Sequence, residues 1–156
     1  FEPTKSYQFE GYTGKETQPH LRVAVQYNIQ KKVVIVKVIS LHSCDLFADD
    51  VTQVRISYGR ERAKQQTAVV RGEEPAFNQT FSFTDVGKAE IQTSSLRFRV
   101  YSRSGMSRMN LRAEGQLEGK KVGRDSPTIC SVPLNKINTI KSEVPMRRLE
   151  SGKRPI

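Results

Sequence analysis

The chain has 156 residues, which is enough for one domain with a buried core and short tails. Its 26 Lys and Arg residues outnumber its 16 Asp and Glu residues, and the formal net charge is +10. No apolar run approaches the roughly 18 residues that a membrane-spanning helix needs. Dense apolar segments also argue against disorder of the whole chain, so the excess charge points to a folded domain with an acidic partner.

The first part of the chain changes from a polar segment to strands. Residues 1–17 are polar and contain proline and glycine, so we predict an N-terminal linker or arm. From residue 20 onward apolar side chains recur at every second position, and 20–27 and 32–40 are predicted to form a hairpin. Further strands are predicted, in chain order, at 54–58, 63–71, 77–83, 96–101, 129–132 and 144–149.

Four segments lack a clear strand pattern. Residues 41–50 are expected to be a loop with some buried apolar groups, 84–94 a connector and 134–137 a short turn. Residues 102–128 are basic and contain glycine; we expect a long loop, functional or disordered, with room for a strand near 111–117. About seven or eight evenly spaced strands and no convincing helix predict an antiparallel β-sandwich. We assign it to residues 18–150, with a C-terminal tail at 151–156.

The order of these features resembles that of a synaptotagmin-like C2 domain. The most specific part is a basic stretch after 54–58, then a Thr-x-Val strand that ends in a basic residue, then a Pro-x-Phe-Asn-x-x-Phe-x-Phe pattern. The matching residues are Thr67, Val69, Arg71, Pro75, Phe77, Asn78, Phe81 and Phe83. The resemblance covers roughly 18–150, and it implies an eight-stranded β-sandwich with binding loops at one end.

Many members of that family hold calcium in these loops through about five aspartates, because calcium prefers hard oxygen ligands. This sequence departs from that pattern. Asp50 lies one residue out of register in the first loop, and Ser102 and Ser104 stand where the third loop would carry aspartates. We therefore predict no functional metal site and no cofactor.

Two groups of residues are candidates for binding. The first is a basic surface that the resemblance relates to lipid-headgroup binding; it comprises Arg55, Arg60, Arg62, Lys64, Arg71, Arg97 and Arg99. The second mixes cations with apolar side chains suited to a bilayer interface or a protein; it comprises Arg103, Met106, Arg108, Met109 and Arg112. The alternatives are a solvated basic face for the first group and a mobile insertion for the second.

Our main hypothesis is a calcium-independent C2-like module that binds anionic phospholipids, either phosphatidylserine or phosphoinositides. Its expected place is the cytoplasmic surface of membranes, in trafficking or tethering. The alternative is an adaptor or dimerisation domain that binds protein without lipid, with the Glu73-Glu74 turn as part of its contact surface. Nucleic acid is disfavoured because the aromatic residues of the predicted strands alternate inward.

Catalysis and disulfide bonding find no support in the sequence. It contains no nucleophile elbow, phosphate-binding loop or HExxH motif, and His20 and His42 are expected to be isolated from each other. We therefore predict that the protein is not an enzyme. The two cysteines, Cys44 and Cys130, exclude a disulfide framework and favour buried thiols in a reducing compartment over a single bridge.

Overall fold

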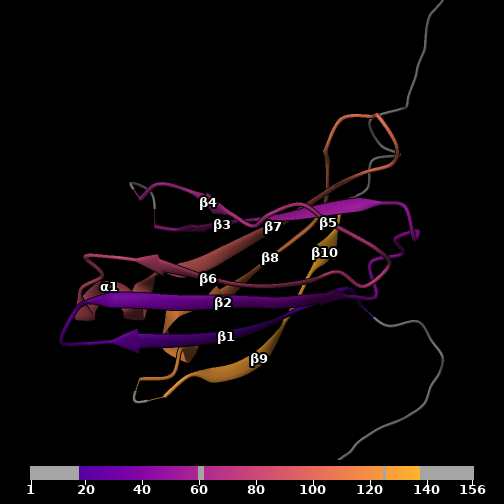
Figure 1. The fold of residues 1–156 in the computed structure, drawn as a ribbon. Helices are drawn as coiled ribbons and strands as arrows, with labels where there is room; N and C mark the ends of the chain where they lie inside the picture. Colours follow the sequence, from indigo (N-terminus) through magenta and orange to yellow (C-terminus); the bar gives the residue numbers. More distant parts are fainter. Residues whose placement is uncertain (1–17, 60–61, 125, 138–156) are drawn as a thin grey trace, which may run out of the picture.

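In the computed structural model, which describes residues 18–59, 62–124 and 126–137, two antiparallel sheets pack face to face (Figure 1). The four-stranded sheet has the order β6-β2-β1-β9, with bounds Ala76–Phe83, Val33–His42, His20–Asn28 and Thr128–Pro133. The six-stranded sheet has the order β10-β8-β7-β3-β4, with bounds Asn135–Lys136, Asn110–Glu118, Ser95–Arg103, Val51–Tyr58 and Gln65–Gln66. In addition, β5 (Val70–Arg71) pairs with β3.

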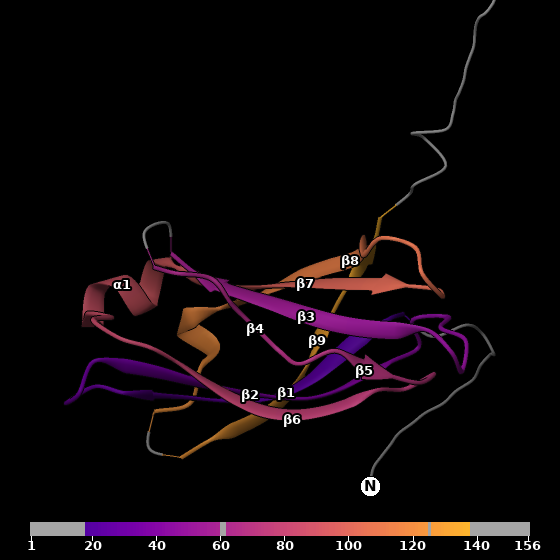
Figure 2. The same cartoon turned by 45° about the horizontal axis from the view of Figure 1, so that its top comes forward.

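The predicted fold class, an all-β sandwich, is confirmed. The predicted strand 63–71 is interrupted and forms the two short strands β4 and β5, which lie between β3 and β6 (Figure 2). Side chains bridge this segment to β6: Gln65 Nε2 donates to the Ser82 carbonyl at 2.7 Å, and Gln79 Oε1 accepts from the Ala68 N–H at 2.6 Å. The predictions for 1–17, 144–149 and 151–156 lie outside the described residues.

Strict alternation builds the core between the sheets. On β1, Leu21, Val23, Val25 and Tyr27 have no exposed surface, and the intervening residues face outward. Phe98 on β7 is also fully buried, and it meets them from the other sheet as part of one apolar cluster. Each such side chain contributes about 1.5–3 kcal/mol by leaving water. The core therefore fixes which residues of each strand face the solvent.

Three segments differ from the prediction. The expected long loop 102–128 is largely structured, since β8 occupies its middle and only 104–109 connects β7 to β8. The connector after β6 contains a short helix, α1 (Lys88–Thr93), in which only Ile91 is buried. Residues 134–137 include β10 instead of a free turn, because Asn135 and Lys136 pair with β8. A short 3-10 helix, η1 (Gly119–Lys121), follows β8.

The two histidines, which we expected to be isolated from each other, lie together. His20 and His42 are register partners on β1 and β2, and their rings stack with centroids 5.2 Å apart. His42 also contacts Ser40 through Nε2 at 2.7 Å and Glu74 through Nδ1 at 3.4 Å. This polar row ties the end of β2 to the turn after β5.

Both cysteines are free thiols, Cys44 buried and Cys130 half-buried. Burial raises the pKa of each thiol, which favours the unreactive protonated form. None of the helices in the described residues has the length and apolar character needed to cross a membrane.

Candidate functional site

The outer face of the six-stranded sheet carries a cluster of cations. Arg99 on β7 lies opposite Arg55 on β3, and Arg97 lies opposite Ser57, so all three arginines occupy outward positions of adjacent strands. Lys64, which precedes β4, is exposed and lines the same hollow as Arg97 and Arg99. We call these four residues, Arg55, Lys64, Arg97 and Arg99, the basic face.

The basic face is hollowed. Three adjoining cavities of about 470, 300 and 70 Å³ lie over the strands, and Arg99 lines all of them. Arg97 lines the two larger ones, and Lys64 lines the largest and the smallest. A shallow, strand-built depression surrounded by cations can contact an anionic headgroup from several sides. Alternate residues on one strand lie about 6.5–7 Å apart, which is a spacing that several phosphate oxygens can span.

Neighbouring side chains hold Arg55 in place. Its guanidinium lies over the Tyr101 ring, 3.9 Å from the ring centroid, and its Nε donates to Gln53 Oε1 at 3.1 Å. Cation–π contact keeps the charge while it restricts the side chain. Arg55 is therefore a pre-oriented cation at one edge of the basic face.

Arg99 has an acidic neighbour. Its Nε lies 3.5 Å from Glu114 Oε1, and the two side chains are 38% and 46% exposed. Exposed pairs of this kind contribute about 0–1 kcal/mol, so an incoming phosphate can compete with Glu114 at little cost. Glu114 is the one acidic residue among the described residues that line the three cavities.

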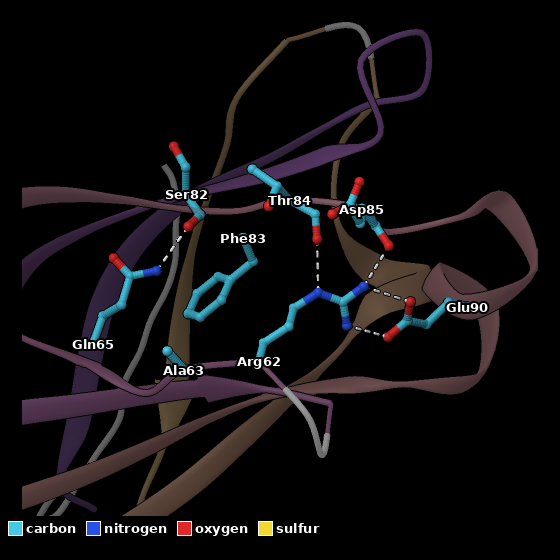
Figure 3. A pocket seen from close by; sticks show the side chains of 8 residues that line it. All are labelled: Arg62, Ala63, Gln65, Ser82, Phe83, Thr84, Asp85 and Glu90. Carbon is cyan, nitrogen blue, oxygen red and sulfur yellow. Dashed lines mark hydrogen bonds and ion pairs between the residues drawn. The ribbon is translucent and has the colours of Figure 1, made fainter.

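Arg62 has a different environment from the other predicted basic residues (Figure 3). Its guanidinium forms a bidentate ion pair with Glu90 of α1, at 2.5 and 2.8 Å, and also donates to the backbone carbonyls of Thr84 and Asp85. These contacts raise its pKa, chiefly through the hydrogen bond to Glu90. The pair lines a polar cavity of about 700 Å³ between β4 and β6. Although Arg62 reaches the rim of the basic face, its charge is offset by Glu90.

The remaining predicted residues lie at the loop end of the sandwich, opposite α1 (Figure 1). Arg71 and Arg103 both pair with Val51, on either side of β3. Arg71 donates to the Asp49 carbonyl, and Arg103 to the Gly105 carbonyl. Arg108 is exposed in the 104–109 loop. The predicted basic set is thus divided between two regions, and Arg60 lies outside the described residues.

Two apolar side chains project from the loop end. Met106 is 96% exposed in the 104–109 loop, and Phe47 is 74% exposed in the 43–50 loop. By contrast, Met109 is half-buried and Arg112 points to Ser102, so neither contributes to the tip. Sequence reasoning identified Met106 but missed Phe47, because an apolar residue in 41–50 is as easily explained by burial as by a binding role.

The loop end does not fit the calcium site that the resemblance suggests. Asp50 is only 2% exposed, and both of its carboxylate oxygens accept hydrogen bonds, from Ser104 Oγ at 2.6 Å and from the Phe47 N–H at 2.9 Å. Asp45 Oδ2 lies 2.5 Å from Lys136 Nζ. Among the described residues, no cluster of three or more His, Cys, Asp or Glu side chains could hold a metal ion.

Protein groups also control the charge of these carboxylates. The hydrogen bonds from Ser104 and Phe47, with a smaller effect of Arg112, lower the pKa of Asp50. The hydrogen bond and charge of Lys136 lower the pKa of Asp45. Both aspartates are therefore ionised near neutral pH, and cations of the chain itself neutralise them.

Comparison with protein families agrees with this architecture. A model described as "C2 domain" matches residues 29–134. The chain belongs to the C2 domain family. Members of this family are modules that bind membranes or proteins and are generally not catalytic.

Solved C2 domains share the fold at low sequence identity. The first (A) C2 domain of RIM from Drosophila has a TM-score of 0.63 at 15% identity, covering 74% of this chain and 98% of that one. The corresponding A domain of RIM2 has a TM-score of 0.59 at 20% identity, covering 76% and 99%. The first C2 domain of human synaptotagmin XIII has a TM-score of 0.53 at 18% identity, covering 78% and 94%. A comparison with curated proteins gives no match.

Two further residues of this C2 domain that shape the basic face were not identified from the sequence. Tyr101 follows the outward parity of Arg97 and Arg99, and that parity is a signal for its place under Arg55. Glu114 is adjacent to Arg99 only through the β7–β8 pairing, and no local pattern in the sequence reveals that register. The four buried aromatics Phe77, Phe81, Phe83 and Phe98 face inward, as predicted.

Proposed function

We propose that this C2 domain binds anionic phospholipid membranes without calcium, through its basic face, as a peripheral module on the cytoplasmic side of membranes in trafficking or tethering. The observation that carries the proposal is the hollow around Arg99, which Arg55, Lys64 and Arg97 surround. Each cation close to an anionic membrane contributes about 1 kcal/mol. Four such residues on rigid strands therefore supply about 4 kcal/mol, a useful membrane affinity.

The loop end supplies a second contact in this proposal. Phe47 and Met106 are placed to enter the headgroup region, and Arg71, Arg103 and Arg108 to meet lipid phosphates. Amphipathic contacts of this kind combine apolar burial with attraction to anionic lipid. We leave out Arg62, Met109 and Arg112, whose side chains are engaged within the domain.

Calcium independence follows from the loop chemistry. A calcium ion takes six to eight oxygen ligands. The carboxylate of Asp50 is engaged by Ser104 and by backbone, and that of Asp45 by Lys136. A divalent ion would have to displace these partners and would also be repelled by Arg112, which acts on both carboxylates.

Vesicle co-sedimentation tests the proposal. The full chain should pellet with vesicles that contain phosphatidylserine or a phosphoinositide, equally in chelator and in millimolar calcium, and less as salt rises. Equal pelleting with neutral phosphatidylcholine vesicles, or none with any vesicle, would refute it. A saturable complex with an acidic protein, in the absence of vesicle binding, would instead favour the adaptor function.

A further inference from the structure

Two loops of the sandwich are joined through one carboxylate. Asp50 ends the 43–50 loop, and its Oδ1 accepts the hydrogen bond from Ser104 Oγ, which belongs to the 104–109 loop. Its Oδ2 accepts from the Phe47 N–H within its own loop, and its backbone N–H donates to the Phe47 carbonyl. Because the carboxylate is almost fully buried, these hydrogen bonds are protected from competition with water.

A cation of the chain lies beside this junction. Arg112 Nη1 donates to Ser102 Oγ at 3.0 Å, and Ser102 is only 1% exposed. The charge of Arg112 acts on both Asp45 and Asp50. On the other side of the first loop, Lys136 Nζ contacts the Asp45 carboxylate. The two carboxylates thus face two cations, and the loop end is locally balanced without an ion.

We propose that Asp50, Ser104 and Arg112 form a metal-free lock that holds the 43–50 and 104–109 loops together, with the Arg112 charge in the role that a bound divalent cation would have. This inference deepens the calcium-independent part of the proposed function, on which it rests. Arg112 is a positioning residue here: it compensates the charge of the loop aspartates and orients Ser102, and it contacts no ligand.

The lock has a consequence for the exposed tips. Asp50 is bonded to Phe47 on one side and to Ser104 on the other, so the backbones that carry Phe47 and Met106 are fixed relative to each other. A loop pair that is already ordered loses little conformational entropy when it meets a surface. The tips are therefore in a binding arrangement at all times.

Amide hydrogen exchange on the full chain, without lipid, tests the lock. In the wild type, exchange in both loops should be the same in chelator and in millimolar calcium. Ser104→Ala and Arg112→Gln should each speed exchange in the 43–50 loop about five- to tenfold, while the β1–β2 hairpin is unchanged. Ser107→Ala is the matched control, because its hydroxyl bonds to the Ser104 carbonyl within its own loop, and it should leave 43–50 unaffected.

A charge exchange gives a second readout. Ser104→Asp combined with Arg112→Gln puts a carboxylate beside Asp50 and removes the resident cation, so millimolar calcium should raise the melting temperature of this variant. Ser104→Asn combined with Arg112→Gln lacks the added carboxylate and should not respond. Unchanged exchange in both single variants, a calcium response of the wild type, or no response of the charge-exchange variant would overturn the lock. Since lipid is absent throughout, these outcomes are separate from failure of membrane binding.

Discussion

The basic face and the loop end contain the same kinds of residue, but use them differently. On the basic face, Arg97 and Arg99 stand at alternate positions of one rigid strand, and Glu114 is only a weak acidic neighbour of Arg99. At the loop end, Arg112 and Lys136 lie against aspartates and neutralise them. Whether an arginine is available to an external anion depends on the carboxylates that the fold brings to it. A count of cations along the sequence cannot supply that information.

The largest effect is expected from the basic face. Arg97→Gln with Arg99→Gln removes two charges, and binding to anionic vesicles should fall about 30-fold, which corresponds to about 2 kcal/mol. Vesicle titration by co-sedimentation measures it. The matched control is Arg22→Gln with Lys37→Gln, an equal charge change on the exposed outer face of the other sheet. Equal losses in the two double variants would mean that net charge alone drives binding.

A smaller effect is expected at the loop tips. Phe47→Ser with Met106→Ser removes apolar surface from both loops, and affinity for the same vesicles should fall about three- to tenfold, because less apolar area is buried. Ile29→Ser is the control, since Ile29 is 43% exposed in the turn between β1 and β2, beside the α1 end. A loss larger than that of the Arg97 and Arg99 double variant would make the loop end the primary contact.

Arg62 separates stability from binding. Arg62→Gln breaks the bidentate pair with Glu90 and leaves the carbonyls of Thr84 and Asp85 without their donor. The free energy of unfolding should fall by about 1–2 kcal/mol in urea denaturation. Vesicle affinity should change less than twofold. A large loss of affinity in a folded Arg62→Gln protein would place Arg62 on the membrane-binding surface after all.

The smallest effect is a pH dependence at the loop end. The pKa of Asp50 is lowered on folding, so its ionised form stabilises the fold above its unfolded pKa of about 3.9, and this contribution is lost as pH falls through the folded value. The stability advantage of the wild type over Asp50→Asn should therefore be constant from pH 7 to about pH 5 and shrink below about pH 4. Urea denaturation of both proteins across this range measures it, and a constant difference would contradict the assignment.

The fold was predictable where period-two alternation is strong. The β1–β2 hairpin and β7 have dense β-branched or aromatic inward positions, and both were predicted within a few residues. In β8, Ala113 is buried while the other side chains of the strand are half-buried or exposed, so its strand pattern is faint. The helix α1 has six residues and buries only Ile91, which is too little for a periodic signal.

The candidate site was predictable in part. Strand parity correctly placed Arg97 and Arg99 outward, because side chains on a strand alternate between its faces. The partners of other residues could not be inferred, since Arg62 and Glu90 are 28 residues apart, and Ser104 and Asp50 are 54 apart. Such contacts exist only after the sheets have packed. They determine which predicted cations remain available to an anion.

The most direct test of binding through the basic face is the orientation of the domain on a membrane. Single spin labels at Gln66→Cys, beside Arg55 on the exposed side of β4, and at Thr80→Cys, on the exposed side of β6, report the two opposite faces when Cys130 is replaced by Ser. On phosphoinositide vesicles in chelator, the Gln66 label should lie at the headgroup level and the Thr80 label in bulk water. The reverse arrangement, or equal immersion of both labels, would contradict binding through the basic face.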